Sequence, residues 1–182
     1  MSFQTAHKRK FDDLKCALHT DFRIQLKREA NGGNTILLAF PPAQEGRYIA
    51  KAEELYVDAC FIDISRLFVQ YIDSVGYDAF EEFYRAYQTT PDQVFKNDDD
   101  DNLFIRIIDA IKAAAASDRI PFIIRTGALH GTGIVNQHIM DDNHVLRLKQ
   151  PLVFFYPAEL ENDTLLFLNF KPASKYRCKL IM

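Results

Sequence analysis

The stretch Thr35-Ile36-Leu37-Leu38-Ala39-Phe40 decides the fold of this sequence. Five apolar residues follow Thr35 without a break, between the turn residues Asn31-Gly32-Gly33-Asn34 and the pair Pro41-Pro42. A strand with one face in water alternates apolar and polar residues, whereas a strand covered on both faces is apolar throughout. The stretch therefore predicts a central strand of a sheet that is covered on both sides.

Similar apolar runs recur along the chain, separated by longer stretches. They are residues 59–64, 120–126, 152–156 and 164–169. Residues 176–182 alternate instead, with Arg177 and Lys179 opposite the apolar positions, as in a half-exposed strand near a sheet edge. Strands that alternate with helical stretches form βαβ units. We therefore predict a single α/β domain over residues 1–182, with three layers and a mostly parallel sheet flanked by helices. Antiparallel pairing of the last strands stays open.

Helical periodicity fills the stretches between these strands. Apolar residues at helical spacing predict helices over residues 3–19, 46–56, 65–75, 77–87 and 103–116. Phe22, Ile24 and Leu26 alternate with polar residues, which indicates a short extended piece or a frayed turn. Thr90-Pro91-Asp92-Gln93 combines a capping threonine, a proline at the first helical position and a capping-box glutamine, so it predicts another helix start.

Composition disfavours several classes of protein. The 182 residues are 48% hydrophobic with a net charge of -3, which indicates a folded domain and makes binding to nucleic acid by this chain alone unexpected. The one basic cluster is residues 7–10. Three cysteines lie far apart, so neither a disulfide framework nor a cysteine zinc site is expected. No signal sequence and no apolar run near the ~20 residues of a membrane span is present, so we expect a cytoplasmic protein without a membrane partner.

A glycine-rich segment, Thr126 to Gly133, follows the predicted strand at residues 120–126. Backbone amides in such loops can hold phosphate. The spacing matches neither GxGxxG nor GxxxxGK[ST], and no lysine follows the glycines. A tight strand-to-helix turn is therefore the preferred interpretation, and a nucleotide loop is the alternative.

Polar residues stand at the carboxyl ends of three predicted parallel strands: Asp63, Thr126 and Tyr156. Ligands of open α/β sheets bind at this edge, so these residues and Gly127 are candidates for a ligand crevice. Asp63 has the alternative role of capping the next helix. No nucleophile elbow, zinc-ligand frame or EF-hand spacing is present, the last despite the aspartates at 98–101. We predict no catalytic residue, no metal and no cofactor.

The predicted helix over residues 77–87 carries more aromatic side chains than one helix needs to seal a core. Tyrosine concentrates contact energy at interfaces and tolerates water before binding. Tyr77, Tyr84 and Tyr87 are therefore candidates for a partner-binding face, with burial in the core as the alternative.

The order of motifs resembles the BrxB family of BREX (bacteriophage exclusion) defence systems. The resemblance is carried by Gly33-Asn34 before the strand that ends at Pro41-Pro42, by Thr126-Gly127-Ala128, and most specifically by the run Pro151 to Pro157. It implies a non-catalytic accessory subunit of a phage-defence system that associates with a methyltransferase, a phosphatase-like protein or an ATPase. A degenerate nucleotide- or nucleic-acid-binding protein that uses the strand-end crevice is the alternative.

Overall fold

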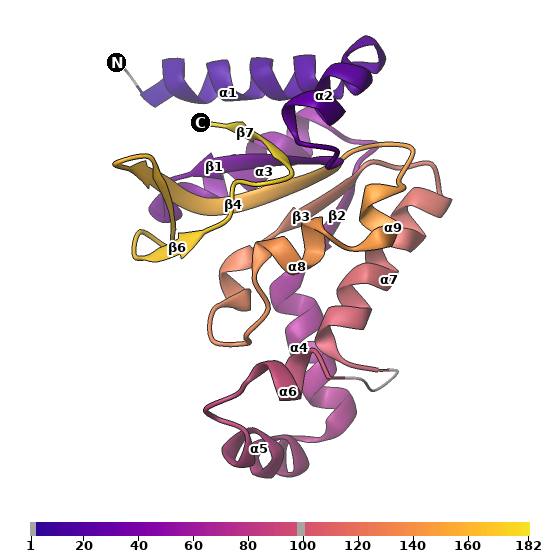
Figure 1. The fold of residues 1–182 in the computed structure, drawn as a ribbon, viewed down its shortest axis with the longest axis vertical. Helices are drawn as coiled ribbons and strands as arrows, with labels where there is room; N and C mark the ends of the chain where they lie inside the picture. The colour runs from indigo at the N-terminus through magenta and orange to yellow at the C-terminus, as the bar shows by residue number, and fades with distance from the viewer. Residues whose placement is uncertain (1–2, 98–100) are drawn as a thin grey trace.

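Five parallel strands form the middle layer of the computed structural model, which describes residues 3–97 and 101–182 (Figure 1). In spatial order they are β2 (Cys60–Asp63), β3 (Pro121–Ile124), β4 (Leu152–Glu161), β1 (Thr35–Phe40) and β7 (Cys178–Ile181). Every residue of β1 is buried, and its neighbours β4 and β7 both run parallel to it. The predicted central strand and mostly parallel sheet are thus confirmed.

The antiparallel part of the sheet is a projecting extension of β4. The last parallel pair between β1 and β4 is Phe40 with Pro157, and from Ala158 onwards β4 pairs antiparallel with β5 (Thr164–Phe167). Strand β6 (Lys171–Ala173) then pairs antiparallel with β5. Strand β7, by contrast, returns to the parallel sheet as its edge strand beside β1.

Helices cover both faces of this sheet (Figure 1). One face lies under α1 (Phe3–Leu18), α2 (Arg23–Glu29) and α3 (Glu45–Leu55). The other lies under α4 (Ile64–Val75), α7 (Leu103–Ala116), α8 (Asn136–Met140) and α9 (Asn143–Leu146). Successive strand residues serve opposite layers: Phe155 packs in the first and Phe154 in the second, and both are fully buried. This sharing explains why the strands are apolar on both faces.

Helix α4 extends beyond the sheet, and α5 (Tyr77–Ala86) and α6 (Asp92–Phe95) lie at its far end (Figure 1). The ring of Phe95 holds this lobe together, because its centroid lies 5.4 Å from that of Phe68 and 5.9 Å from those of Tyr71 and Phe80. The Tyr71 hydroxyl donates to the carbonyl of Val94 at 2.7 Å. No residue of α5 is fully buried.

Two local predictions are only partly confirmed. Residues 20–29 form the 3-10 turn Thr20–Phe22 and helix α2, not an extended piece, because their alternation does not mark a buried face: Leu26 is buried, but Ile24 is 79% exposed. The helix start predicted at residues 90–93 is confirmed by α6, but the capping detail is wrong, because the helix begins after Pro91 without any side-chain cap. The carbonyl of Thr90, not its hydroxyl, accepts from the backbone N–H of Gln93.

Two further expectations from the sequence concern the run of aspartates and the absence of a membrane span. The aspartates at 98–100 lie outside the described residues. Within residues 3–97 and 101–182, no helix is long and apolar enough to cross a membrane.

Candidate functional site

Asp63 and Thr126, two of the predicted crevice residues, are engaged in contacts that hold the strand ends. Asp63 is the N-cap of α4, and its Oδ1 accepts from the backbone N–H of Arg66 at 3.2 Å and from Ser65 Oγ at 2.6 Å. Its Oδ2 lies 3.1 Å from Nε of Arg125. Thr126 is fully buried and donates to the carbonyl of Phe155 at 2.7 Å. The capping role of Asp63 is therefore confirmed, and Thr126 ties β3 to β4.

Two charged residues at the same strand ends were not predicted from the sequence. Glu45, the first residue of α3, has a buried Oε1 without a hydrogen-bond partner in the described chain. Burial raises the pKa of this carboxyl, Arg125 opposes the rise and Asp63 adds to it. Arg125 itself has a left-handed backbone with φ of 55°, unusual for a residue other than glycine.

The glycine-rich segment forms a turn that packs on its surroundings. It begins with the 3-10 turn η3 (Thr126–Leu129) and leads to α8, a helix of only five residues. Gly133 has φ of 76°, and a Cβ added there would lie 2.7 Å from the backbone nitrogen of Asp92. A Cβ at Gly127 would meet only the side chain of Leu168, at 3.7 Å. These contacts favour the interpretation as a strand-to-helix turn.

The histidines near this segment make local contacts. His138 accepts from the backbone N–H of Val135 at 3.3 Å, and burial lowers its pKa. His144 lies 3.1 Å from Asp142, the N-cap of α9. Across residues 3–97 and 101–182, no group of three or more histidine, cysteine, aspartate or glutamate side chains is placed to hold a metal ion.

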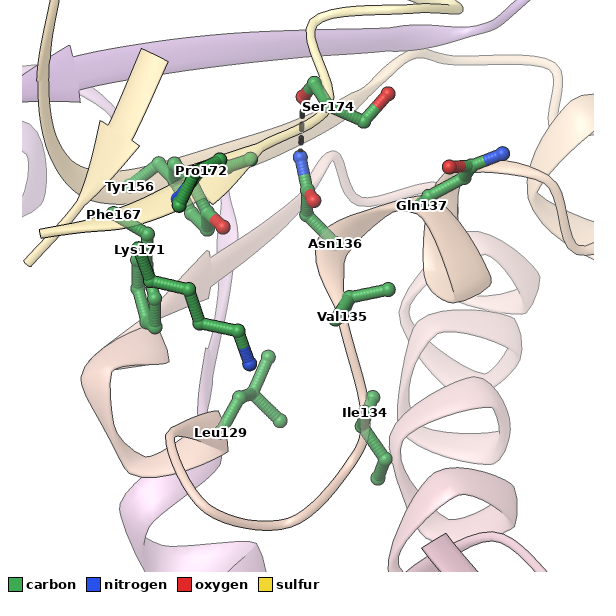
Figure 2. Close-up of a pocket in the computed structure, with 11 residues that line it drawn as sticks. Leu129, Ile134, Val135, Asn136, Gln137, Tyr156, Phe167, Lys171, Pro172 and Ser174 are labelled. Carbon is green, nitrogen blue, oxygen red and sulfur yellow. Dashed lines mark hydrogen bonds between the residues drawn. The ribbon is translucent and has the colours of Figure 1, made fainter. Parts of the chain in front are cut away.

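A cavity of about 170 Å³ opens below the sheet, between η3, the segment leading into α8, and strand β6 (Figure 2). Its apolar wall consists mainly of Leu129, Ile134 and Phe167. Tyr156 lines it as well, but Asp63, Thr126 and Gly127 do not. The four crevice candidates therefore do not share this cavity, and of the four only Tyr156 faces it.

Polar atoms without protein partners converge on this cavity. Tyr156 is 3% exposed, its ring stacks on Phe167 at 4.7 Å, and its hydroxyl has no hydrogen-bond partner among the described residues. Burial raises the pKa of this phenol, so it keeps its proton. Figure 2 shows the hydroxyl pointing between Lys171 and Asn136, neither of which was predicted from the sequence. Within the described chain, Lys171 has no ion-pair partner.

The three tyrosines of the predicted partner face lie on the outside of the α4–α6 lobe. Tyr77, Tyr84 and Tyr87 are 68%, 37% and 40% exposed. The phenylalanines of the same helix face inward, where Phe80 and Phe83 pack against the core. Tyr84 stacks on Phe80 at 5.9 Å and Tyr87 meets Phe83 edge-on at 5.1 Å, so these two tyrosines have fixed rings.

Comparison with known proteins gives no relative: no family model, no curated protein and no solved structure matches this chain. The roles of the cavity and of the tyrosines therefore have to follow from their own contacts, burial and charge.

Proposed function

We propose that this protein is a non-catalytic subunit that binds another protein through the tyrosine face of α5, which we define as Tyr77, Tyr84 and Tyr87. The resemblance to the BrxB family makes a BREX-type phage-defence system the proposed setting. Its methyltransferase, phosphatase-like protein and ATPase are then the proposed partners.

One observation carries this proposal: the phenylalanines and the tyrosines of the α5 segment lie on opposite sides of the helix. The phenylalanines turn inward to seal the lobe, and the tyrosines turn outward to water. The rings of Tyr84 and Tyr87 pack with one side on Phe80 and Phe83, but each of the three tyrosines leaves more than a third of its surface exposed to water. Exposed tyrosines with fixed rings lose little conformational freedom on binding and bury a large area.

The position of α5 supports the same role. The helix lies at the end of the molecule farthest from the sheet (Figure 1), so a partner can reach it without contacting the sheet or the helices that cover it. Its amino-terminal residue Tyr77 is the most exposed of the three. Tyr77 follows Gly76, whose φ of 85° turns the chain out of α4.

The test is to change each of the three tyrosines singly to alanine and to measure binding of the purified chains to the three proposed partners. A central interface tyrosine contributes about 2 kcal/mol or more, so the affected variant should bind about thirtyfold more weakly. Tyr176→Ala is the matched control, because Tyr176 is also exposed, at 52%, but lies outside this lobe. Affinities that stay unchanged in three folded variants would refute the proposed face.

A further inference from the structure

The cavity lined by Tyr156 has an apolar wall and polar groups that have no hydrogen-bond or ion-pair partner within the described chain. A buried tyrosine hydroxyl normally finds a hydrogen-bond partner, because leaving it unpaired away from water is costly. Tyr71, which is equally buried, donates to the carbonyl of Val94. Tyr156 has no such acceptor among the described residues, although its ring packs against those of Phe154 at 5.5 Å and Phe167 at 4.7 Å. The hydroxyl of Tyr156 opens into the cavity, so its hydrogen bond goes to water or to a ligand there. Its hydroxyl is a donor directed at whatever fills the cavity (Figure 2).

The charge of the lining residues indicates an anion. Lys171 is the only charged residue among them, and Figure 2 shows its side chain extending past Tyr156 toward Leu129. Among the described residues, no carboxylate lines the cavity to neutralise this ammonium group. An ammonium and a phenol hydroxyl are both donors, and together they suit an acceptor with negative charge.

Asn136 adds a different polar atom. This side chain is 2% exposed, and its Nδ2 donates to the carbonyl of Ser174 at 2.6 Å, which fixes the amide. The remaining atom, Oδ1, can only accept a hydrogen bond. A ligand that satisfies all three groups therefore carries an anionic acceptor and, beside it, an O–H or N–H donor.

The size of the cavity limits the ligand further. A cavity of about 150 Å³ with apolar walls accommodates benzene, so the 170 Å³ found here fits about six to eight non-hydrogen atoms. Ligand pockets for larger molecules such as nucleotides usually enclose at least about 300 Å³. The apolar wall of Leu129, Ile134 and Phe167 suits a short branched hydrocarbon group.

We propose that this cavity binds a small carboxylate that carries a short branched hydrocarbon group and a hydrogen-bond donor next to the carboxylate. Lys171 and the Tyr156 hydroxyl bind the carboxylate, Asn136 Oδ1 accepts from the donor, and the apolar wall holds the hydrocarbon. The same chemistry occurs in a free 2-hydroxy acid and in the carboxyl-terminal residue of a peptide. The site does not involve α5, so it is independent of the proposed docking role.

The test is a binding titration of the full chain, followed by amide chemical shifts, with 2-hydroxy-3-methylbutanoate as the probe. We expect a dissociation constant of about 1 mM, since the ligand is so small, with shifts centred on the residues that line the cavity. The corresponding amide, which lacks the charge, should bind at least about tenfold more weakly. N-acetylvaline is the second probe. It is larger than the cavity, so its acetyl group would extend through the opening as the preceding residue of a peptide would. Stronger binding than the hydroxy acid identifies a chain terminus as the natural ligand, and weaker binding identifies a free acid.

Three variants make the assignment specific. Lys171→Gln and Tyr156→Phe should each weaken binding of the hydroxy acid, by about tenfold for the lysine, while their melting temperatures show that they remain folded. Lys175→Gln is the matched control, because Lys175 lies on the same segment but pairs with Asp163 at 2.6 Å and does not line the cavity. Equal binding of acid and amide, equal losses in Lys171→Gln and Lys175→Gln, or no shifts with either acid at 10 times the expected dissociation constant would each overturn the proposal.

Discussion

Gly131 and Gly133 allow the role of the glycine-rich segment to be measured by two matched substitutions. Both residues have a positive φ, 84° and 76°, so alanine is strained at either position. Their surroundings differ. A Cβ at Gly131 meets nothing within 4 Å, whereas a Cβ at Gly133 would lie 2.7 to 2.9 Å from the backbone nitrogen, the Cα and the Cβ of Asp92.

The free energies of unfolding of Gly131→Ala and Gly133→Ala should therefore differ. A left-handed backbone costs an alanine about 1–2 kcal/mol, and the loss of chain entropy in the unfolded state returns about 0.4–1 kcal/mol. Gly131→Ala should thus lose about 0.5–1 kcal/mol. Gly133→Ala carries the same cost and must also push α6 away from the loop, at about 1–3 kcal/mol for such overpacking.

Urea unfolding of the two variants and the wild type measures this difference. With an m-value of about 2 kcal/mol/M, an extra loss of 1–3 kcal/mol lowers the midpoint of Gly133→Ala by about 0.5–1.5 M relative to Gly131→Ala. Equal midpoints would refute the contact with Asp92 as the reason for the glycine. If the segment were a phosphate loop, added nucleotide would stabilise the wild type, and both substitutions would reduce that stabilisation. We expect that added nucleotide does not stabilise the wild type.

Two other substitutions test the buried polar groups. Burial raises the pKa of Glu45, so this carboxyl stabilises the fold below its ordinary pKa of 4.5 and loses that contribution as the pH rises above it. Glu45→Gln should therefore raise the melting temperature at pH 7 and leave it unchanged near pH 4. A lower melting temperature of this variant at pH 7 would contradict the reasoning. Asn34 donates to the carbonyls of Val145, Leu148 and Gln150 at 3.4, 2.9 and 3.3 Å, so Asn34→Ala should cost about 2 kcal/mol in urea unfolding, against less than about 0.5 kcal/mol for the exposed control Gln25→Ala.

The parallel sheet could be predicted from the sequence because strands that helices cover on both faces are apolar at consecutive positions. In residues 36–40 of β1 and 152–155 of β4, each residue faces one helix layer or the other, so these positions are apolar, and the run is visible without knowledge of the partner strands. The spatial order of the strands produces no such local pattern in the sequence. Strand β7 pairs with the edge of β1 opposite β4, and this depends on contacts between segments far apart in the chain.

Short elements were harder to predict, since their conformation is set by what packs on them. Strand β6 has three residues and contains Pro172, so its own sequence argues against a strand, and only pairing with β5 defines it. In α2 the apparent alternation of apolar residues is coincidental, because a single side chain, Leu26, reaches the core. A pattern of three residues cannot distinguish these cases.

For the candidate cavity, too, the residue defined by its own strand could be predicted, and the residues defined by distant contacts could not. Tyr156 was predicted as a ligand residue because it stands at the end of a parallel strand, a position defined by the strand alone. Lys171 and Asn136 have ordinary sequence surroundings, and each would be an unremarked polar residue on an exposed hairpin or at a helix start. What makes them candidates is the absence of partners within the described chain for the ammonium and for Oδ1, and that absence arises only when the hairpin of β5 and β6 closes over η3 and the start of α8. Sequence patterns can show where a chain buries its apolar residues, but they cannot show which polar atoms remain unpaired after it has done so.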